Sequence, residues 1–236
     1  MDFSQIRLLL GLLQEAGIPV CIIGEFALNY NNAPRVVHDL ELCVPADDLG
    51  AAKSVFESQE GLLEIEDKTK YNLYTQYKKG FPRFRSYSKP RFYVVIFTDK
   101  HYHLDPLQKC VIYQKEHQHT REYSRELLDS FSPDEIATLP FPRFTPLFRG
   151  FCRSYIETQE ATAAMAAECL VDGININEEW CHAHFDPPES AESGFALRLV
   201  NSRGSRIDDF SLNQVTCFIP DLQEAQRLQR IPGFYE

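Results

Sequence analysis

The segment from residue 20 to 44 constrains the fold of this 236-residue chain more than any other part of it. A short, wholly apolar run at 19–23 is typical of a strand that is buried on both faces. Gly24 then turns the chain, and residues 25–30 predict a short helix. After a polar loop comes a second predicted strand, over 36–44. The segment therefore predicts two strands of one sheet, joined by a turn, a helix and a loop.

The second of these strands carries two carboxylates, Asp39 and Glu41. Because strand side chains alternate, both point to the same face of the sheet. Two neighbouring carboxylates in an apolar strand are unfavourable unless a cation, a proton or solvent relieves them. A hard divalent cation is the usual solution, since it prefers oxygen ligands. Three interpretations stay open: a functional site beside the bend at Gly24, a solvated strand end, or carboxylates that form salt bridges with Arg35.

The order of these residues resembles the minimal nucleotidyltransferase family. In that family a strand ends in a glycine turn, and an Arg stands four residues before an Asp-x-Asp or Asp-x-Glu pair. Here Gly24 matches the turn, Arg35 lies four residues before Asp39, and Asp39-Leu40-Glu41 matches the pair. The resemblance implies that the turn cradles a triphosphate and that Asp39 and Glu41 hold Mg²⁺. The Leu-Pro-Phe-Pro segment at 139–142 also looks like fungal proteins of this fold.

The chain departs from the family pattern at two places. Glu25 stands where the family has Gly or Ser, and a carboxylate there repels a triphosphate. The third family carboxylate falls near Val95, which is apolar, and Asp99 and Asp105 only follow that strand. Glu25 has two interpretations. It is either a helix N-terminal acid favoured by the macrodipole, or an acid of the Asp39–Glu41 hollow that keeps a proton for catalysis.

Residues 71–100 are rich in aromatic and basic side chains. Within them, 91–97 is predicted to be a strand because it is aromatic and β-branched. The rest is interpreted as a solvated hairpin, as a substrate lid or as an anion-binding patch. Together with the glycine turn, this region supplies the expected substrate-binding residues: Gly24, Arg35, Arg83, Arg85, Tyr93, Tyr102 and His103.

The remaining pattern predicts a fold of the α/β (α+β) class. Further strands are predicted at 62–66 and 109–113, and helices at 46–57, 145–158, 159–171 and 176–184. With these elements, the resemblance implies a small mixed nucleotidyltransferase-type sheet with flanking helices over 1–114. Residues 115–236 are expected to form a mostly helical region that closes one side of the cleft.

Composition excludes several classes of protein. A net charge of -10 disfavours broad nucleic-acid binding. The seven Cys are scattered and form no C-x-x-C pair, so neither a disulfide framework nor a zinc ribbon is predicted. Residues 181–184 (Cys-His-Ala-His) lack a partner pair at zinc-finger spacing. No segment has the character of a signal peptide or a membrane span, so a cytoplasmic protein is expected.

Three hypotheses for function follow. The first is a repurposed scaffold that binds a small organic substrate and catalyses a metal-independent isomerisation or cyclisation, with Glu25, Asp39 and Glu41 as catalytic or anchoring groups and no cofactor. The second is a Mg²⁺-dependent nucleotidyltransferase that transfers NMP from an NTP, with Asp39 and Glu41 as metal ligands. The third is a non-catalytic binding module.

Overall fold

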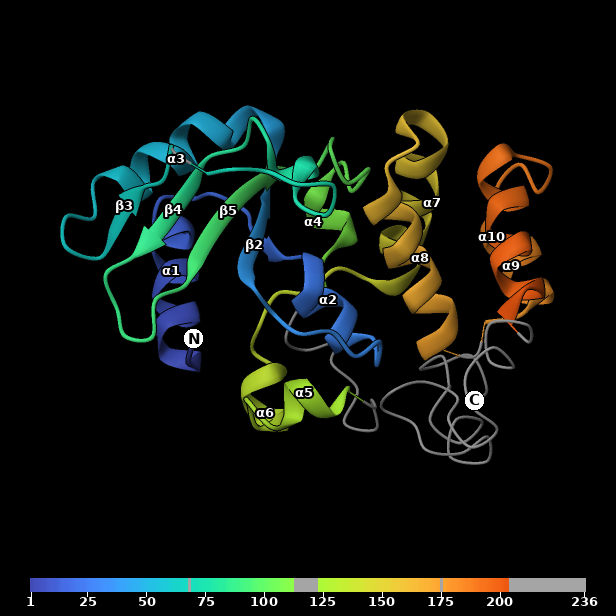
Figure 1. Ribbon diagram of the computed structural model, residues 1–236, viewed down its shortest axis with the longest axis horizontal. Coiled ribbons are helices and arrows are strands. Elements are labelled where there is room, and N and C mark those ends of the chain that lie inside the picture. Colours follow the sequence, from blue (N-terminus) through green and yellow to red (C-terminus); the bar gives the residue numbers. More distant parts are fainter. Residues whose placement is uncertain (68, 113–122, 175, 204–236) are drawn as a thin grey trace.

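The computed structural model describes residues 1–67, 69–112, 123–174 and 176–203 (Figure 1). Its centre is a mixed five-stranded sheet with the strand order β1-β2-β5-β4-β3. Strands β2 and β5 are parallel, and the other neighbours are antiparallel. The small mixed sheet with flanking helices is thereby confirmed. The strands are β1 (Cys21–Ile22), β2 (Asp39–Val44), β3 (Leu63–Ile65), β4 (Arg83–Ser86) and β5 (Tyr93–Thr98).

The register gives the sheet two different faces. Leu40, Val94 and Phe84 lie side by side on one face and are fully buried. Helix α3 (Leu49–Glu57) covers this face, with the ring of Phe56 centred 5.5 Å from that of Phe84. Helix α1 (Phe3–Glu15) packs against α3. The opposite face carries the carboxylates of β2, as expected from strand alternation.

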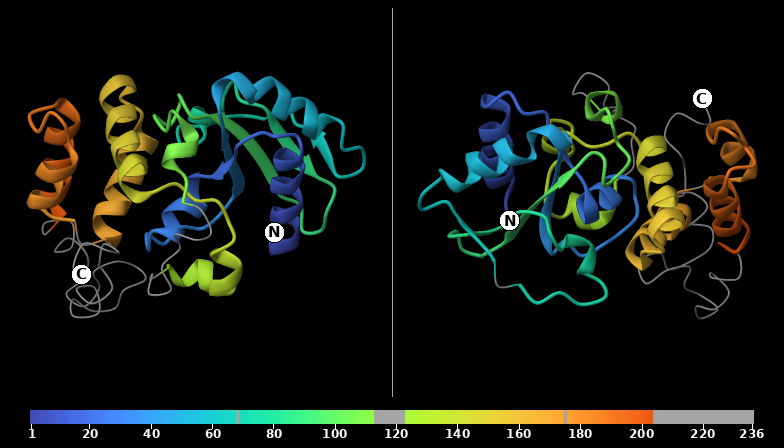
Figure 2. Two further views of the ribbon diagram at one scale, coloured as in Figure 1. Left: turned by 180° about the vertical axis from the view of Figure 1, so that it is seen from behind. Right: turned by 90° about the horizontal axis from the view of Figure 1, so that it is seen from above.

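Over its described residues, 123–174 and 176–203, the C-terminal half is mostly helical, as predicted. Helices α7 and α8 pack side by side next to the sheet, and α9 and α10 lie beyond them (Figures 1 and 2). Helix α8 also contacts α2, which follows the Gly24 turn. Helix α10 was not predicted; it begins just after the Pro187-Pro188 break, capped by Ser190. The bounds are α2 (Gly24–Tyr30), α7 (Phe144–Thr158), α8 (Ala161–Gly173), α9 (Glu178–His184) and α10 (Ala191–Asn201).

Short helices fill the connections of the fold. They are η1 (Ala46–Asp48), η2 (Gln76–Lys78), α4 (Leu107–Cys110), α5 (Arg125–Leu128) and α6 (Pro133–Ile136). The predicted strand at 109–113 is wrong over its described residues, because α4 takes up its beginning. Val111 makes only an isolated bridge to Pro142, so this segment pairs with the chain before α7 and does not join the sheet. Residue 113 lies outside the described residues.

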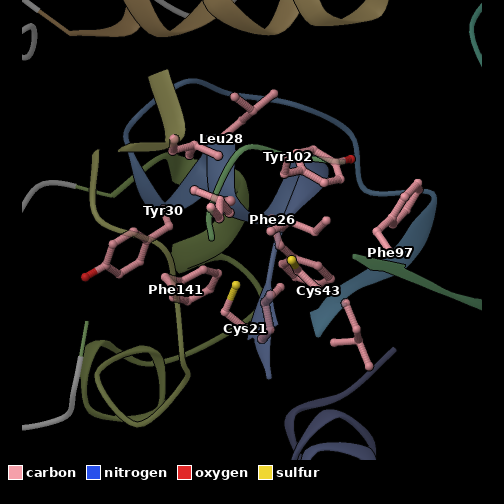
Figure 3. Packing of buried hydrophobic residues seen from close by; sticks show 14 of the residues in the cluster. Cys21, Phe26, Leu28, Tyr30, Cys43, Phe97, Tyr102 and Phe141 are labelled. Atoms are coloured by element: carbon pink, nitrogen blue, oxygen red, sulfur yellow. The ribbon is translucent and has the colours of Figure 1, made fainter. Parts of the chain in front are cut away.

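One apolar core connects the two halves (Figure 3). The ring of Tyr30 from α2 stacks on Phe141 with centroids 4.2 Å apart. Cys21 and Cys43 face each other across β1 and β2 and are buried. The six cysteines within the described residues are free thiols. Within the same part of the chain, no helix combines the length and the apolar character that crossing a membrane requires.

Helix α7 approaches the backbone after β5 at Gly150. A Cβ atom there would lie 2.2 Å from the carbonyl oxygen of Tyr102. We expect Gly150→Ala to lower the free energy of unfolding by about 1–3 kcal/mol, because a helix or the chain at Tyr102 must shift. Gly11→Ala in α1 is the control: nothing lies within 4 Å of the added methyl, so a gain of about 0.5–1 kcal/mol is expected. Urea denaturation measures both, and a neutral Gly150→Ala would contradict the contact.

Candidate functional site

A cavity of about 690 Å³ opens between the carboxylate face of β2 and helices α7 and α8. The segment at 72–78, which precedes β4, forms one wall, and residues 160–166 at the start of α8 form another. The structure thus brings together most of the side chains that the sequence singled out. The predicted site residues that line it are Gly24, Glu25, Arg35, Asp39, Glu41, Arg83 and Tyr102.

The two carboxylates of β2 share an internal cation, the ammonium group of Lys78. Its Nζ lies 2.7 Å from Asp39 Oδ2 and 2.7 Å from Glu41 Oε1. All three side chains are buried, with Lys78 only 4% exposed. Lys78 comes from η2, more than thirty residues further along the chain. A protein side chain therefore supplies the positive charge that the carboxylate pair requires.

Glu41 accepts two further hydrogen bonds, from the hydroxyl of Tyr77 and, at 3.3 Å, from that of Tyr102. Burial raises the pKa of Glu41 above its usual range, although Lys78 and the Tyr77 hydroxyl act in the opposite direction. Burial also lowers the pKa of Lys78, but Glu41 and Asp39 outweigh it, so the pKa of Lys78 is raised overall. Lys78 is therefore a charged ammonium group at neutral pH.

Asp39 has a second basic partner, Arg83 of β4, whose Nη2 lies 3.3 Å from Asp39 Oδ1. The guanidinium group of Arg83 sits 4.2 Å above the ring of Tyr93. Tyr93 thus supports Arg83 from β5 and does not itself line the cavity. Arg85 is also absent from the lining, because it forms an ion pair with Glu64 of the neighbouring strand β3. These two expected substrate contacts have structural partners.

His103, the third expected contact outside the cavity, lines a separate hollow of about 360 Å³ next to α7. Its Nε2 lies 3.4 Å from the carboxylate of Glu157. His101, and not His103, lines the main cavity, and its ring stacks on that of Phe97 with centroids 5.4 Å apart. Burial, together with the nearby charge of His103, lowers the pKa of His101 to about 4. His101 is consequently a neutral imidazole at physiological pH, and sequence reasoning missed it.

The turn at Gly24 touches the carboxylate pair directly. Its φ of +64° lies in the left-handed region, and an added Cβ would lie 2.2 Å from Glu41 Oε2. The next residue, Glu25, occupies the first turn of α2 and also lines the cavity. Its carboxylate accepts a hydrogen bond of 2.6 Å from the backbone N–H of His38 and lies 2.8 Å from the Nδ1 of that residue. Glu25 therefore lies both at the start of a helix and in the cavity with Asp39 and Glu41, and His38 is its principal partner.

A divalent cation does not fit between Asp39 and Glu41 while Lys78 lies there. Val95 is the register neighbour of Glu41 and is apolar and buried, so it offers no third ligand. Asp99 lies outside the cavity, where its carboxylate accepts hydrogen bonds from the N–H groups of Ala46 and Lys100. Across the part of the chain that the structure describes, no three His, Cys, Asp or Glu side chains are grouped to hold a metal ion.

Comparison with known proteins gives matches among solved structures. No protein-family model matches the chain, and no curated protein matches it. A solution structure of the antibiotic-resistance factor ANT(2'')-Ia is similar with a TM-score of 0.39 and 10% identity, covering 89% of this chain and 97% of that one. A crystal structure of ANT(2'')-Ia in complex with adenylyl-2''-tobramycin gives the same TM-score and identity over 83% of this chain and 97% of that one. At this TM-score the likeness is one of broad outline and says nothing of substrate, activity or a fungal origin.

Proposed function

We propose that the chain is an enzyme that binds a small organic molecule in the cavity and acts on it without a metal ion, by proton transfer of the isomerisation or cyclisation type. One observation carries this proposal: Lys78 lies between Asp39 and Glu41, where a carboxylate pair of this kind would otherwise require a metal ion. The cation is thus covalently part of the chain. The size of the cavity favours a small-molecule pocket over the third hypothesis, a non-catalytic binding module.

The charge of the cavity also favours an organic substrate over a nucleoside triphosphate. Four carboxylates line it against three basic side chains, so no excess positive charge is left for a polyanion. Asp39 is paired with both Lys78 and Arg83, which reduces the attraction of these cations for a phosphate group. The lining carboxylates are Glu25, Asp39, Glu41 and Glu160, and the basic side chains are Arg35, Lys78 and Arg83.

The groups in the cavity divide into two roles. Asp39 and Glu41 are occupied as acceptors and therefore position Lys78, while Glu25 is held by His38. Lys78 donates to these two carboxylates and keeps a third N–H for an oxygen atom of the substrate. His101 is the candidate general base, since it is neutral and its ring nitrogens have no hydrogen-bond partner among the described residues. It would take a proton from one carbon of the substrate, and the imidazolium group so formed would return that proton to another carbon.

Isothermal titration calorimetry tests the proposal. Titrating the full chain with Mg²⁺, and then with ATP in the presence of Mg²⁺, is expected to give no binding heat, because Lys78 holds the metal position and the lining lacks excess positive charge. Titration with EDTA present provides the reference for metal-independent heat. Micromolar binding of ATP that requires Mg²⁺ would contradict the proposal.

The second candidate function is a Mg²⁺-dependent nucleotidyltransferase. The observation in its favour is the left-handed turn at Gly24, which lies directly against Glu41, beside the Asp39–Glu41 pair on β2. This activity requires η2 to move away and to remove Lys78 from the carboxylates. It predicts release of pyrophosphate from a nucleoside triphosphate, and its loss in Asp39→Ala. Release that survives Asp39→Ala would exclude it.

A further inference from the structure

We infer that the substrate is an uncharged, largely apolar molecule that places a carbonyl oxygen against Lys78 and its apolar part at the mouth of the cavity. The inference rests on the proposed function and narrows its substrate to one chemical class. Three features of the cavity support it: its apolar mouth, its charge-compensated floor and its volume.

The mouth of the cavity exposes large apolar side chains. Tyr74 is 60% exposed and Met165 is 38% exposed, and they line the cavity from the segment at 72–78 and from α8 respectively. Leu73, 70% exposed, lies between the lining residues Asn72 and Tyr74. Single exposed apolar side chains are common on protein surfaces, but exposed apolar side chains gathered in one place mark a binding site. Tyr74 and Met165 border the same cavity, which points to an apolar ligand that they cover.

The inner walls of the cavity are also apolar. Leu28 of α2 and Phe151 of α7 line the cavity, as do the small side chains of Ala163 and Ala166 on α8. Such walls suit an apolar body, whose burial contributes in proportion to the apolar area removed from water. A charged ligand would gain nothing from them and would lose its hydration.

The floor of the cavity, formed by Asp39, Glu41 and Lys78, offers a hydrogen-bond donor whose positive charge is already paired. Lys78 has three N–H groups, of which Asp39 and Glu41 accept two. Because the carboxylates already neutralise the ammonium group, an anionic ligand would compete with them, whereas a carbonyl oxygen needs only the remaining N–H. A ketone, aldehyde or amide oxygen therefore matches the floor better than a carboxylate or a phosphate.

The volume of the cavity sets the size of the ligand. A cavity of about 690 Å³ falls within the usual range of drug-sized sites. This volume is large enough for an apolar body of two fused rings. This size also permits a fluorescent probe of the same chemistry to be used as the ligand.

The test uses three dyes and three single substitutions in the full chain. Prodan is an uncharged naphthalene ketone whose emission reports the polarity around its carbonyl. The same dye without its propionyl group lacks the carbonyl, and anilinonaphthalene sulfonate replaces it with an anion. Tyr74→Asp and Met165→Asp place a charge at the mouth, and Leu8→Asp is the matched control, since Leu8 is half exposed on α1 and remote from the lining. Lys78 is left intact because the fold depends on it.

Prodan is expected to bind one molecule per chain with a blue-shifted emission. Tyr74→Asp and Met165→Asp each weaken this binding about tenfold, whereas Leu8→Asp leaves it unchanged. The dye that lacks the carbonyl binds about tenfold more weakly than Prodan, which measures the Lys78 hydrogen bond. The sulfonate dye also binds more weakly than Prodan.

Each arm can overturn the inference. The inference is wrong if Prodan does not bind up to its solubility limit. It is also wrong if Prodan binds equally well to the mouth variants and to Leu8→Asp, or no better than the other two dyes bind. If calorimetry then still shows no Mg²⁺-dependent nucleotide binding, the substrate class alone is wrong. Binding of ATP with Mg²⁺ by the same preparation would instead remove the proposed function.

Discussion

Replacing Lys78 with methionine is expected to lower the free energy of unfolding by about 3–5 kcal/mol, the largest single effect that we predict for this chain. The change removes the ammonium group that lies 2.7 Å from both Asp39 and Glu41 and leaves two buried carboxylates facing each other. Repulsion and lost hydration then act together, since Asp39 is only 6% exposed and Glu41 only 2% exposed. Urea denaturation at neutral pH, followed by circular dichroism, measures the loss.

Two further variants separate the cause from the loss of packing. Lys53→Met removes an exposed lysine that pairs with Glu57 at 3.4 Å, and it should cost at most about 1 kcal/mol. Combining Lys78→Met with Asp39→Asn and Glu41→Gln removes the uncompensated charge and should restore most of the stability.

Mn²⁺ should raise the melting temperature of Lys78→Met but not that of the wild type, since an open carboxylate pair then binds a cation. A loss below about 1 kcal/mol in Lys78→Met would mean that the ion pairs are not formed.

The same ion pairs make the free energy of unfolding depend on pH. Asp39 and Glu41 raise the pKa of Lys78 above its unfolded value of 10.5. The stability that this shift contributes is therefore complete below the unfolded pKa and is lost as the pH rises through the folded pKa. Lys78→Met lacks this contribution, so the difference in stability between it and the wild type should shrink at strongly alkaline pH.

Gly24→Ala is expected to have the second largest effect, a loss of about 2–4 kcal/mol in the free energy of unfolding. The φ of +64° is strained for any residue with a Cβ, and the new methyl would lie 2.2 Å from Glu41 Oε2. Glu41 must then move, which also weakens its contact with Lys78. Thermal and urea denaturation report the loss of stability, and Prodan binding reports the disturbance of the cavity floor.

Gly61→Ala is the matched control for the backbone part of this effect. Gly61 has a similar φ of +77°, but nothing lies within 4 Å of its added methyl. It should cost only about 1–2 kcal/mol, the strain of the left-handed conformation by itself. Equal losses in the two variants would show that Gly24 has no special relation to Glu41.

Part of the site could be predicted from the sequence because it is local. Alternation along β2 places Asp39 and Glu41 on one face, and the glycine turn lies only a short helix and loop away from them. The expected neighbour of this pair on the central strand, Val95, is the register partner of Glu41 in the structure. The spacing of residues along one strand, and the apolar runs on either side, are sufficient for such a prediction.

Other parts of the site depend on side chains that meet across long stretches of chain. Lys78 belongs to a basic and aromatic segment that composition describes equally well as a solvated hairpin or a lid. His101 and His103 are two residues apart, and only the tight turn after β5 decides which of them enters the cavity. Arg85 lies on the same face as Arg83, yet a glutamate of β3 holds it away. No periodicity encodes such pairings.

The sequence by itself determined the carboxylate strand, the bend beside it and the main helices of the second half that the structure describes, because each follows from the local pattern of apolar and polar residues. The tertiary structure alone decided that the charge of the two carboxylates is met by an ammonium group of the same chain. Electrostatic attraction acts through space, so the partner of a buried charge is fixed by which segments fold against each other and not by their distance along the chain.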